Sequence, residues 1–298
     1  MDAEHFRRVI QACFPGLPVH SIAFLAEGWS SRVWEVNGSY VFRFPKRAEI
    51  HAGLRKEIRL LPALAPLVCL PVPGFEYVWT GGAQYEGPFV GYPTIRGRPM
   101  MPEHLASVGY EGPARQLGDF LTSLHRFPCV QALALGIPGG DAASWRHEYQ
   151  VLYQTVEQRV LPLLSAPARH NLATTWQDFL QDESNFRFTP VLIHRDLSSE
   201  HILFDAEQGC VTGIIDWEDA TIGDPVFDFT GLLDYGPDFV RQALHAYEGP
   251  ADEAVFARAR FYHAIGPCHE VLFGLDAGLA EHVAAGLAGL RAIWSVPC

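Results

Sequence analysis

Two stretches of sequence, each an apolar run that ends directly in polar residues, constrain the fold most strongly. The first is V-L-I-H-R-D-L-S-S-E-H-I-L-F-D over residues 191–205, and the second is G-I-I-D-W-E-D over residues 213–219. Short apolar runs of this kind predict buried strands. If the strands are neighbours, one ligand can contact the polar residues at their ends, which are His194, Asp196, His201 and Asp216.

The first part of the chain predicts an antiparallel sheet. Asn37 and Gly38 separate two β-rich runs, residues 32–36 and 40–44. Both positions of such a two-residue turn need positive φ, which Asn and Gly tolerate best, so a hairpin is expected. The alternation of side chains along a strand puts Arg43 on the face opposite Phe42 and Phe44. The remaining strands are expected within residues 21–31, 75–80 and 88–95.

A helix is predicted over residues 52–64, where Leu54, Ile58 and Leu61 form an apolar stripe. Glu57 lies beside that stripe and is expected to point toward the sheet. The prolines between residues 62 and 74 are expected to break the helix and form a loop.

The rest of the chain is expected to be mainly helical. After a hinge at residues 91–97, an apolar helical face runs to Leu124 and ends before Pro128. A second hairpin is expected from residues 191–194, 201–204 and 211–216. Further helices are expected at residues 150–164, 170–182, 237–247, 252–264 and 278–293. We therefore predict an α+β, bilobal architecture with a small β-rich N-terminal lobe (residues 1–95) and a larger, mainly helical C-terminal lobe (residues 96–298).

The charge distribution excludes some classes of partner. The net charge is −12, and residues 1–95 carry nine basic and eight acidic side chains, so the excess of negative charge lies in the second part. Such a field repels nucleic acid and membrane phosphates and attracts a cationic ligand. No apolar run is long enough to span a bilayer, and the N-terminus lacks the apolar core of a signal peptide. The six cysteines are scattered without a C-x-x-C pair, which favours reduced thiols. We expect a cytoplasmic monomer.

The polar residues of the two stretches suit phosphoryl transfer. In that reaction one carboxylate orients the attacking hydroxyl and accepts its proton, while others hold magnesium against phosphate oxygens. The same four residues could form a metallohydrolase cluster, an alternative that gives Arg43 and Glu57 no role.

The run H-R-D-L-S-S-E-H-I-L-F-D, together with I-I-D-W-E-D, resembles the aminoglycoside phosphotransferase family, which has the protein-kinase fold, and most closely its 2''-phosphotransferases. The resemblance extends to Y-V-F-R-F-P-K (residues 40–46), L-R-K-E-I (54–58), G-P-F-V-G-Y-P-T-I-R-G (87–97) and G-L-A-G-L-R-A-I (286–293).

The resemblance implies a role for each matching residue. Asp196 would be the catalytic base, and Asp216 and His201 would bind Mg²⁺. Histidine at position 201, where most kinases have asparagine, is a trait of the 2'' group. Arg43 stands where a phosphate-binding lysine is expected, and Glu57 would be its ion-pair partner.

The resemblance also implies the binding sites. Gly28 and Ser30 would belong to the glycine loop over the nucleotide, ATP or GTP. The hinge residues Thr94 and Ile95 would contact its purine. Candidates for binding a small, hydroxylated, cationic acceptor are Asp234, Asp238 and Glu270.

Other polar and aromatic residues have a structural interpretation. We expect Asp224 to be a turn or helix-cap residue, and Asp228 a hydrogen-bonding residue. His194 is expected to anchor the loop, whereas Trp217 and Trp294 are expected in the core, and His263 and His269 to be ordinary helix residues.

Three alternatives to an aminoglycoside kinase remain open. The first keeps the fold and takes another acceptor, such as a macrolide, a sugar, an amino alcohol or a metabolite. The second is a nucleotide-binding protein without catalysis, and the third is the metallohydrolase.

Overall fold

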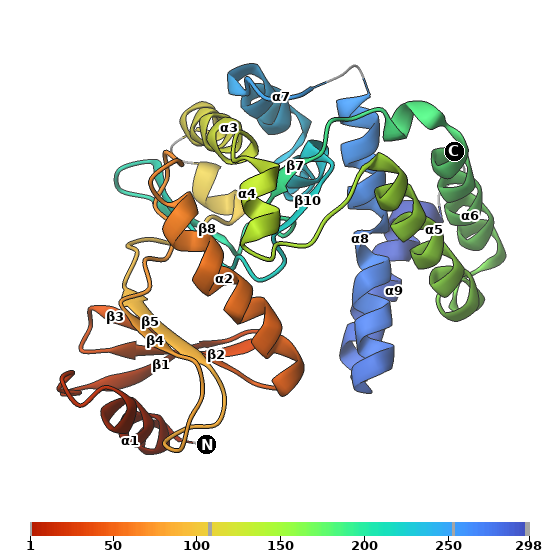
Figure 1. The fold of residues 1–298 in the computed structure, drawn as a ribbon. Helices are drawn as coiled ribbons and strands as arrows, with labels where there is room; N and C mark the ends of the chain where they lie inside the picture. Colours follow the sequence, from red (N-terminus) through yellow and green to blue (C-terminus); the bar gives the residue numbers. More distant parts are fainter. Residues whose placement is uncertain (1, 107–108, 252–253, 296–298) are drawn as a thin grey trace.

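A five-stranded antiparallel sheet occupies the N-terminal part of the molecule in the computed structural model, which describes residues 2–106, 109–251 and 254–295 (Figure 1). The strand order is β1-β2-β3-β5-β4. The predicted hairpin is confirmed, because β2 and β3 pair in register and Asn37 and Gly38 have φ of 56° and 64°. The strands are β1 (Ile22–Glu27), β2 (Ser31–Val36), β3 (Tyr40–Pro45), β4 (Tyr77–Trp79) and β5 (Phe89–Pro93).

Two helices cover the two faces of this sheet. Helix α1 (Ala3–Cys13), which the sequence did not predict, packs Phe6 and Ile10 against Phe42 and Phe44 of β3. Helix α2 (His51–Leu64) covers the other face and brings Glu57 toward β3 (Figure 1). The alternation along β3 therefore places Arg43 toward α2, as expected.

The C-terminal part is mainly helical, with two small sheets among the helices. One sheet has the order β6-β8-β9 and the other pairs β10 with β7. These strands are β6 (Arg98–Pro99), β7 (Val191–Ile193), β8 (Ile202–Asp205), β9 (Cys210–Ile214) and β10 (Thr221–Gly223). The helices are α3 (Glu111–His125), α4 (Cys129–Ala134), α5 (Ala142–Arg159), α6 (Ala166–Gln181), α7 (Pro237–Ala246), α8 (Val255–Ala277) and α9 (Ala280–Trp294).

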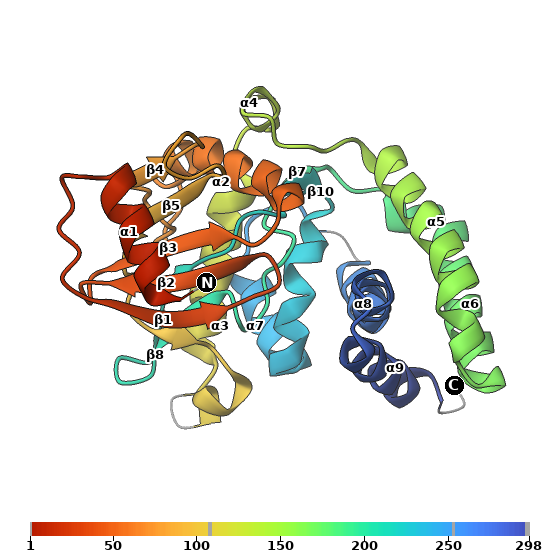
Figure 2. The same cartoon turned by 90° about the horizontal axis from the view of Figure 1, so that it is seen from below.

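The helices pack in two groups around separate cores. Helices α3 and α7 enclose one core with Trp217 at its centre. Helices α5, α6, α8 and α9 form the second group, which contains Trp294 and stands to one side in Figure 2. Both tryptophans are thus core residues, as expected. No helix among the described residues is both long and apolar enough to cross a membrane.

The predicted second hairpin is partly wrong. Strands β8 and β9 pair as expected, but β7 pairs with β10, which the sequence did not predict. The chain therefore leaves one sheet at Ile193 and enters another at Ile202. A run of three apolar residues carries no information about which partner strand it meets, so only packing decides the pairing.

The predicted end of the helix at residue 64 is confirmed, although Pro62 was expected to break it, whereas the predicted helix end at residue 264 is wrong. Pro62 lies inside α2. The helix continues to Leu64 because its own side chains Leu60, Leu61 and Leu64 are buried in the core. Helix α8 was expected to end at residue 264 but continues through Pro267 to Ala277, since Cys268 and Val271 are buried. In both helices the burial of apolar side chains outweighs the lost backbone hydrogen bond.

Other boundaries differ more modestly. Helix α5 begins at residue 142, eight residues earlier than predicted, because Asp141 caps it by accepting from the Ser144 N–H at 2.8 Å. Helix α4 was not predicted. The predicted start of α8, at residues 252–253, lies outside the described residues. The division of the chain between residues 95 and 96 stays a prediction.

The contact between α3 and α7 provides a test of this packing. A Cβ added at Gly118 would collide with the carbonyl oxygen of Ala243 on α7, whereas one added at Gly112 of the same helix would meet nothing within 4 Å. Gly118→Ala is expected to lower the free energy of unfolding by about 1–3 kcal/mol. Gly112→Ala is expected to leave it unchanged or raise it by up to about 1 kcal/mol. Urea unfolding of both variants measures the difference, and equal effects would contradict the close packing.

Candidate active site

The loop between β7 and β8 is held by one buried carboxylate, Asp228, in the short helix Pro225–Phe229. Its Oδ2 accepts from the His194 N–H at 2.9 Å, and its Oδ1 accepts from the Arg195 N–H at 2.8 Å. Arg195 has φ of 71°, a conformation that is strained for a residue with a Cβ. These bonds stabilise that backbone and fix the direction in which Asp196 leaves it. The expected structural role of Asp228 is confirmed.

Asp228 is itself held by two buried side chains from the helical core. The Nε2 of His125, in α3, lies 3.1 Å from the Asp228 carboxylate, and its Nδ1 lies 2.6 Å from the hydroxyl of Tyr247. This role of His125 was not predicted, because a lone histidine on an apolar helix face gives no signal of its partner. The loop that carries Asp196 is thus connected to the packing of α3.

His194 anchors the same loop, as expected. Its Nε2 donates to the Ile215 carbonyl at 3.0 Å, which leaves Nδ1 free to accept from the Asp196 N–H at 3.2 Å. Burial lowers the pKa of His194 to about 4, so the ring is neutral near pH 7. A neutral ring with this tautomer ties the loop of Asp196 to the strand that leads to Asp216.

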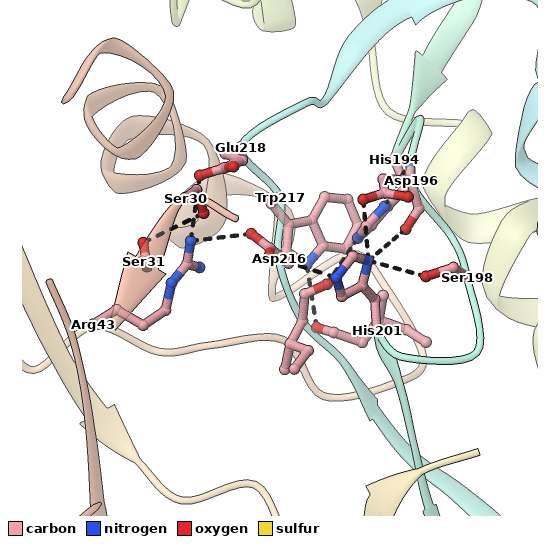
Figure 3. A network of polar contacts seen from close by, with 12 residues as sticks. Ser30, Ser31, Arg43, His194, Asp196, Ser198, His201, Asp216, Trp217 and Glu218 are labelled. Carbon is pink, nitrogen blue, oxygen red and sulfur yellow. Dashed lines mark hydrogen bonds and ion pairs between the residues drawn. The ribbon is translucent and has the colours of Figure 1, made fainter. Parts of the chain in front are cut away.

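Asp196, His201 and Asp216 converge at one place (Figure 3). The His201 Nδ1 lies 3.3 Å from the Asp196 carboxylate, and its Nε2 lies 3.5 Å from the Oδ2 of Asp216. The Asp196 side chain is 50% exposed and therefore reachable from solvent. Desolvation by the surrounding loop raises its pKa to about 6, against the attraction of His201.

Arg43 joins this group from the N-terminal sheet. Its guanidinium donates to both carboxylate oxygens of Glu57, at 3.0 and 3.1 Å, and to the Oδ1 of Asp216 at 3.0 Å. Glu57 is completely buried; its burial raises the pKa of Glu57, and Arg43 opposes that rise. One guanidinium therefore connects β3, α2 and the loop after β9.

Glu218 is a third carboxylate beside Arg43, and its role was not predicted. Its Oε2 lies 3.7 Å from the Arg43 guanidinium, and its Cβ lies close to Gly53 of α2, where an added Cβ would approach within 3.1 Å. Burial, followed by the charge of Asp216, raises the pKa of Glu218 to about 7. In the sequence, Glu218 could have been recognised from its position two residues after Asp216.

The donor atoms around Asp216 fit a cation. The Nδ1 of His201 lies 2.8 Å from the Asp196 carbonyl oxygen, which can only accept, so Nδ1 carries the proton. In the neutral ring, the lone pair of Nε2 then faces the Oδ2 of Asp216. Two electron-rich atoms in this position require a proton or a metal ion between them. Carboxylate oxygens of Glu57, Asp216 and Glu218 also lie within 4.8 Å of one another, although Arg43 already binds Glu57.

The predicted glycine loop connects β1 with β2. The Gly28 N–H donates to the Ser31 carbonyl at 3.0 Å, and the Gly28 carbonyl accepts from the Lys46 ammonium at 3.1 Å. The Ser30 side chain lies beside Glu218, so the loop reaches the acidic group described above (Figure 3).

The two predicted hinge residues, Thr94 and Ile95, make different contacts within the protein. The Thr94 N–H is already engaged, because it donates to the Ser39 carbonyl at 2.8 Å. The Ile95 side chain packs against Gly213 of β9, where an added Cβ would meet it at 2.7 Å. A cavity of about 470 Å³ lies beside the hinge, but none of Arg43, Asp196 and Asp216 lines it.

The three candidate acceptor carboxylates lie on separate elements, each with a basic partner. Asp234 pairs with His263 of α8 at 2.9 Å, Asp238 pairs with Arg241 on its own helix α7, and Glu270 of α8 pairs with His282 of α9 at 3.6 Å. The structure does not bring them into one cluster. His263 therefore has an ion-pair partner that the sequence did not predict.

Asp224 and Glu148 complete the surroundings of the loop. Asp224 caps the helix Pro225–Phe229, as expected, and also forms a buried ion pair with Arg258 at 2.8 Å. Glu148 of α5 pairs with Arg195, next to Asp196, and was not predicted.

The contacts of Asp228 generate a prediction. In Asp228→Asn, an amide group replaces one carboxylate oxygen and opposes a backbone N–H donor. We expect the free energy of unfolding to fall by about 2–3 kcal/mol and kcat to fall more than nucleotide affinity. The control Asp141→Asn keeps a good helix cap and should stay within about 0.5 kcal/mol of the parent. Chemical unfolding and nucleotide titration measure both, and a stable, fully active Asp228→Asn would contradict the anchoring role.

Comparisons with known proteins agree with this geometry. A model of the phosphotransferase enzyme family matches residues 21–262. Viomycin phosphotransferase of Streptomyces vinaceus is 26% identical over 217 residues, which cover 71% of this chain and 73% of that protein. The GDP complex of wild-type aminoglycoside 2'-phosphotransferase-IIIa has a TM-score of 0.90 at 30% identity, over 99% of both chains. The GDP and kanamycin complex of APH(2")-IIia has a TM-score of 0.88 at 31% identity, over 97% of both chains.

These similarities confirm the family resemblance and the bilobal, kinase-like fold predicted from the sequence. Because the family model spans most of the chain and the fold agrees along nearly its whole length, the chain belongs to the phosphotransferase enzyme family and is a phosphotransferase that uses an alcohol group as acceptor.

Proposed function

We propose that the protein transfers the γ-phosphoryl group of ATP or GTP to a hydroxyl group of an aminoglycoside-like polycation, with Asp196 as the catalytic base. The observation that carries the proposal is a row of polar groups that crosses the site. Asp196 is open to solvent, the pair of His201 and Asp216 lies next to it, and Arg43 binds the far side of Asp216. A nucleophile and a phosphate group fit at the two ends of such a row.

Asp196 acts on the acceptor. It orients the hydroxyl group and accepts its proton while the hydroxyl oxygen forms a bond to the γ-phosphorus. The bond from that phosphorus to the bridging oxygen of the β-phosphate breaks, and the nucleoside diphosphate leaves. Asp196 is half exposed, so an acceptor reaches it without rearrangement of the core.

Asp216 and His201 would hold a divalent cation. Mg²⁺ takes oxygen ligands, which Asp216 supplies, whereas the imidazole nitrogen of His201 is a less usual ligand. When bound, the ion would neutralise charge on the phosphate oxygens. Arg43, held by Glu57, would bind phosphate as well, since a guanidinium can donate two parallel hydrogen bonds.

The nucleotide would lie between the glycine loop and the hinge. Gly28 and Ser30 would cover the phosphates, and Thr94 and Ile95 would contact the purine. Since the Thr94 N–H already donates to Ser39, we assign purine recognition to the Ile95 N–H and the Thr94 carbonyl. Two similar solved structures are GDP complexes, which supports a purine nucleotide.

Acidic residues of the C-terminal part would receive the acceptor. Asp234 and Glu270 each pair with a histidine, which is a weaker competitor than a permanently charged arginine. An ammonium group of the acceptor could therefore replace either histidine, whereas Asp238 would have to release Arg241. A similar solved structure contains kanamycin, a fact that favours a polycationic acceptor.

The assignment of the base predicts the behaviour of Asp196→Asn. Asparagine preserves the shape of the side chain but does not accept the proton, so turnover is expected to fall by about 10²–10⁴-fold. Nucleotide affinity should remain within about twofold of the parent, since Asp196 contacts the acceptor rather than the nucleotide. The control Asp205→Asn, at the end of β8, should retain turnover. Near-normal turnover of Asp196→Asn would disprove the assignment.

The proposed acceptor class predicts a pattern of turnover and resistance. Nucleotide consumption should depend on kanamycin or gentamicin, and the gene should protect a sensitive bacterium from them. Glu270→Gln should raise KM for the polycation about two- to tenfold without changing KM for the nucleotide. Turnover with a macrolide, a sugar or an amino alcohol instead would assign another acceptor. Nucleotide binding with no transfer to any acceptor would indicate a protein without catalysis.

A further inference from the structure

An aromatic contact connects the tip of the glycine loop to the helices on the opposite side of the site. The indole ring of Trp29 lies on the ring of Phe273 in α8, with centroids 3.8 Å apart and planes at 30°. The ring of His282, from α9, packs edge to face against both, with its centroid 5.0 Å from that of Trp29 and 5.2 Å from that of Phe273. In Figure 2 the loop between β1 and β2 projects toward α8 and α9.

Trp29 is not a core residue. It is 51% exposed and belongs to none of the buried clusters among the described residues. The sheet beneath it is completed by Trp34 and Phe44, so the fold does not require this ring. Because the exposed indole of Trp29 stacks on a ring from the other lobe, this contact influences the relative position of the two lobes.

The loop that carries Trp29 has little freedom of its own. Lys46 binds it twice, because its N–H donates to the Ser30 carbonyl at 2.8 Å and its ammonium donates to the Gly28 carbonyl at 3.1 Å. The Ser30 side chain, next in the sequence, lies beside Glu218 near Asp216 (Figure 3). A shift of Trp29 is therefore transmitted to the backbone that would cover the phosphates.

We propose that Trp29 is a positioning residue that fixes the glycine loop to the acceptor side of the site by stacking on Phe273. The proposal rests on the proposed function, since it assigns the nucleotide to this loop. The stacked pair closes the loop over the phosphates and limits the access of water to the γ-phosphorus. It also lies beside Glu270, whose partner His282 contacts both rings, so acceptor binding and loop closure share one cluster.

Closure of the glycine loop determines whether the acceptor hydroxyl or a water molecule attacks the γ-phosphorus. In transfer, the acceptor oxygen forms the bond to the γ-phosphorus, and its proton passes to Asp196. In hydrolysis, a water oxygen forms that bond, its proton passes to Asp196, and inorganic phosphate leaves with the nucleoside diphosphate. Both reactions break the same bond to the β-phosphate oxygen, so a loop that opens more often should raise the share of hydrolysis.

The test compares Trp29→Ala, Trp29→Phe, Phe273→Ala and the double variant Trp29→Ala/Phe273→Ala. Stacked aromatic pairs predict an effect of about two- to tenfold on nucleotide affinity. Calorimetric titration with the β,γ-imido analogues of ATP and GTP, in the presence of Mg²⁺, measures that affinity. The release of inorganic phosphate without acceptor, divided by the rate of transfer, measures the share of hydrolysis. Leu25→Ala and Leu275→Ala are matched controls, because both side chains are exposed; Leu25 lies on β1, which leads into the loop of Trp29, and Leu275 lies on α8, the helix of Phe273.

We expect each alanine variant to bind the analogue more weakly and to hydrolyse a larger share of the nucleotide. Trp29→Phe should restore most of both properties, and the double variant should equal the stronger single variant, because both remove the same contact. Additive effects, or effects equal to those of the leucine controls, would overturn the proposal. If the parent protein binds neither analogue, the proposed function fails as well. If the parent binds and Trp29→Ala binds equally well, with an unchanged share of hydrolysis, only the role of Trp29 fails.

Discussion

The buried ion pair between Arg43 and Glu57 is the interaction on which the arrangement of the site depends. Both carboxylate oxygens of Glu57 accept from one guanidinium, and the same guanidinium reaches Asp216. A buried carboxylate without such a partner is strongly unfavourable, so α2 cannot move from β3 without exposing an uncompensated charge. Lys56 of α2 strengthens the connection, because its ammonium donates to the Ala220 carbonyl at 2.8 Å. The orientation of α2 and the position of the loop around Asp216 are thus set together.

A second buried group, the Asp228 carboxylate, fixes the loop that carries Asp196 in a similar way. Asp228 receives two backbone N–H groups from that loop, and His125 and Tyr247 connect it to the helical core. Arg195 and Asp216 both have positive φ, which costs about 1–3 kcal/mol for each such residue. The strain lies on the two loops that carry Asp196 and Asp216, and buried carboxylate or guanidinium contacts hold each of them. Rigid positioning of this kind is what phosphoryl transfer requires of a protein.

Several features could be predicted because their signal is local. The turn at Asn37 and Gly38 follows from backbone sterics. The separation of Arg43 from Phe42 and Phe44 onto opposite faces follows from the period of a strand, and the inward direction of Glu57 follows from the period of a helix. The group of Asp196, His201 and Asp216 was predicted from its spacing and from a family resemblance. Features that depend on distant partners were not predicted. The pairing of β7 with β10 joins residues that are at least 28 positions apart, and the contact of Trp29 with Phe273 joins residues that are 244 positions apart. The continuation of α8 through Pro267 depends on the burial of its apolar side chains.

The sequence by itself determined the class of chemistry, because its carboxylates and histidines suit phosphoryl transfer and its motifs resemble the aminoglycoside phosphotransferase family, a resemblance that also implies roles for Arg43 and Glu57. Only the tertiary structure decided which of the acidic side chains are available. Glu218 joins the site, and Asp234, Asp238 and Glu270 each have a basic neighbour. The physical reason is that the role of a carboxylate is set by the charge and burial of the atoms around it. Those atoms come from elements whose approach the local sequence does not encode.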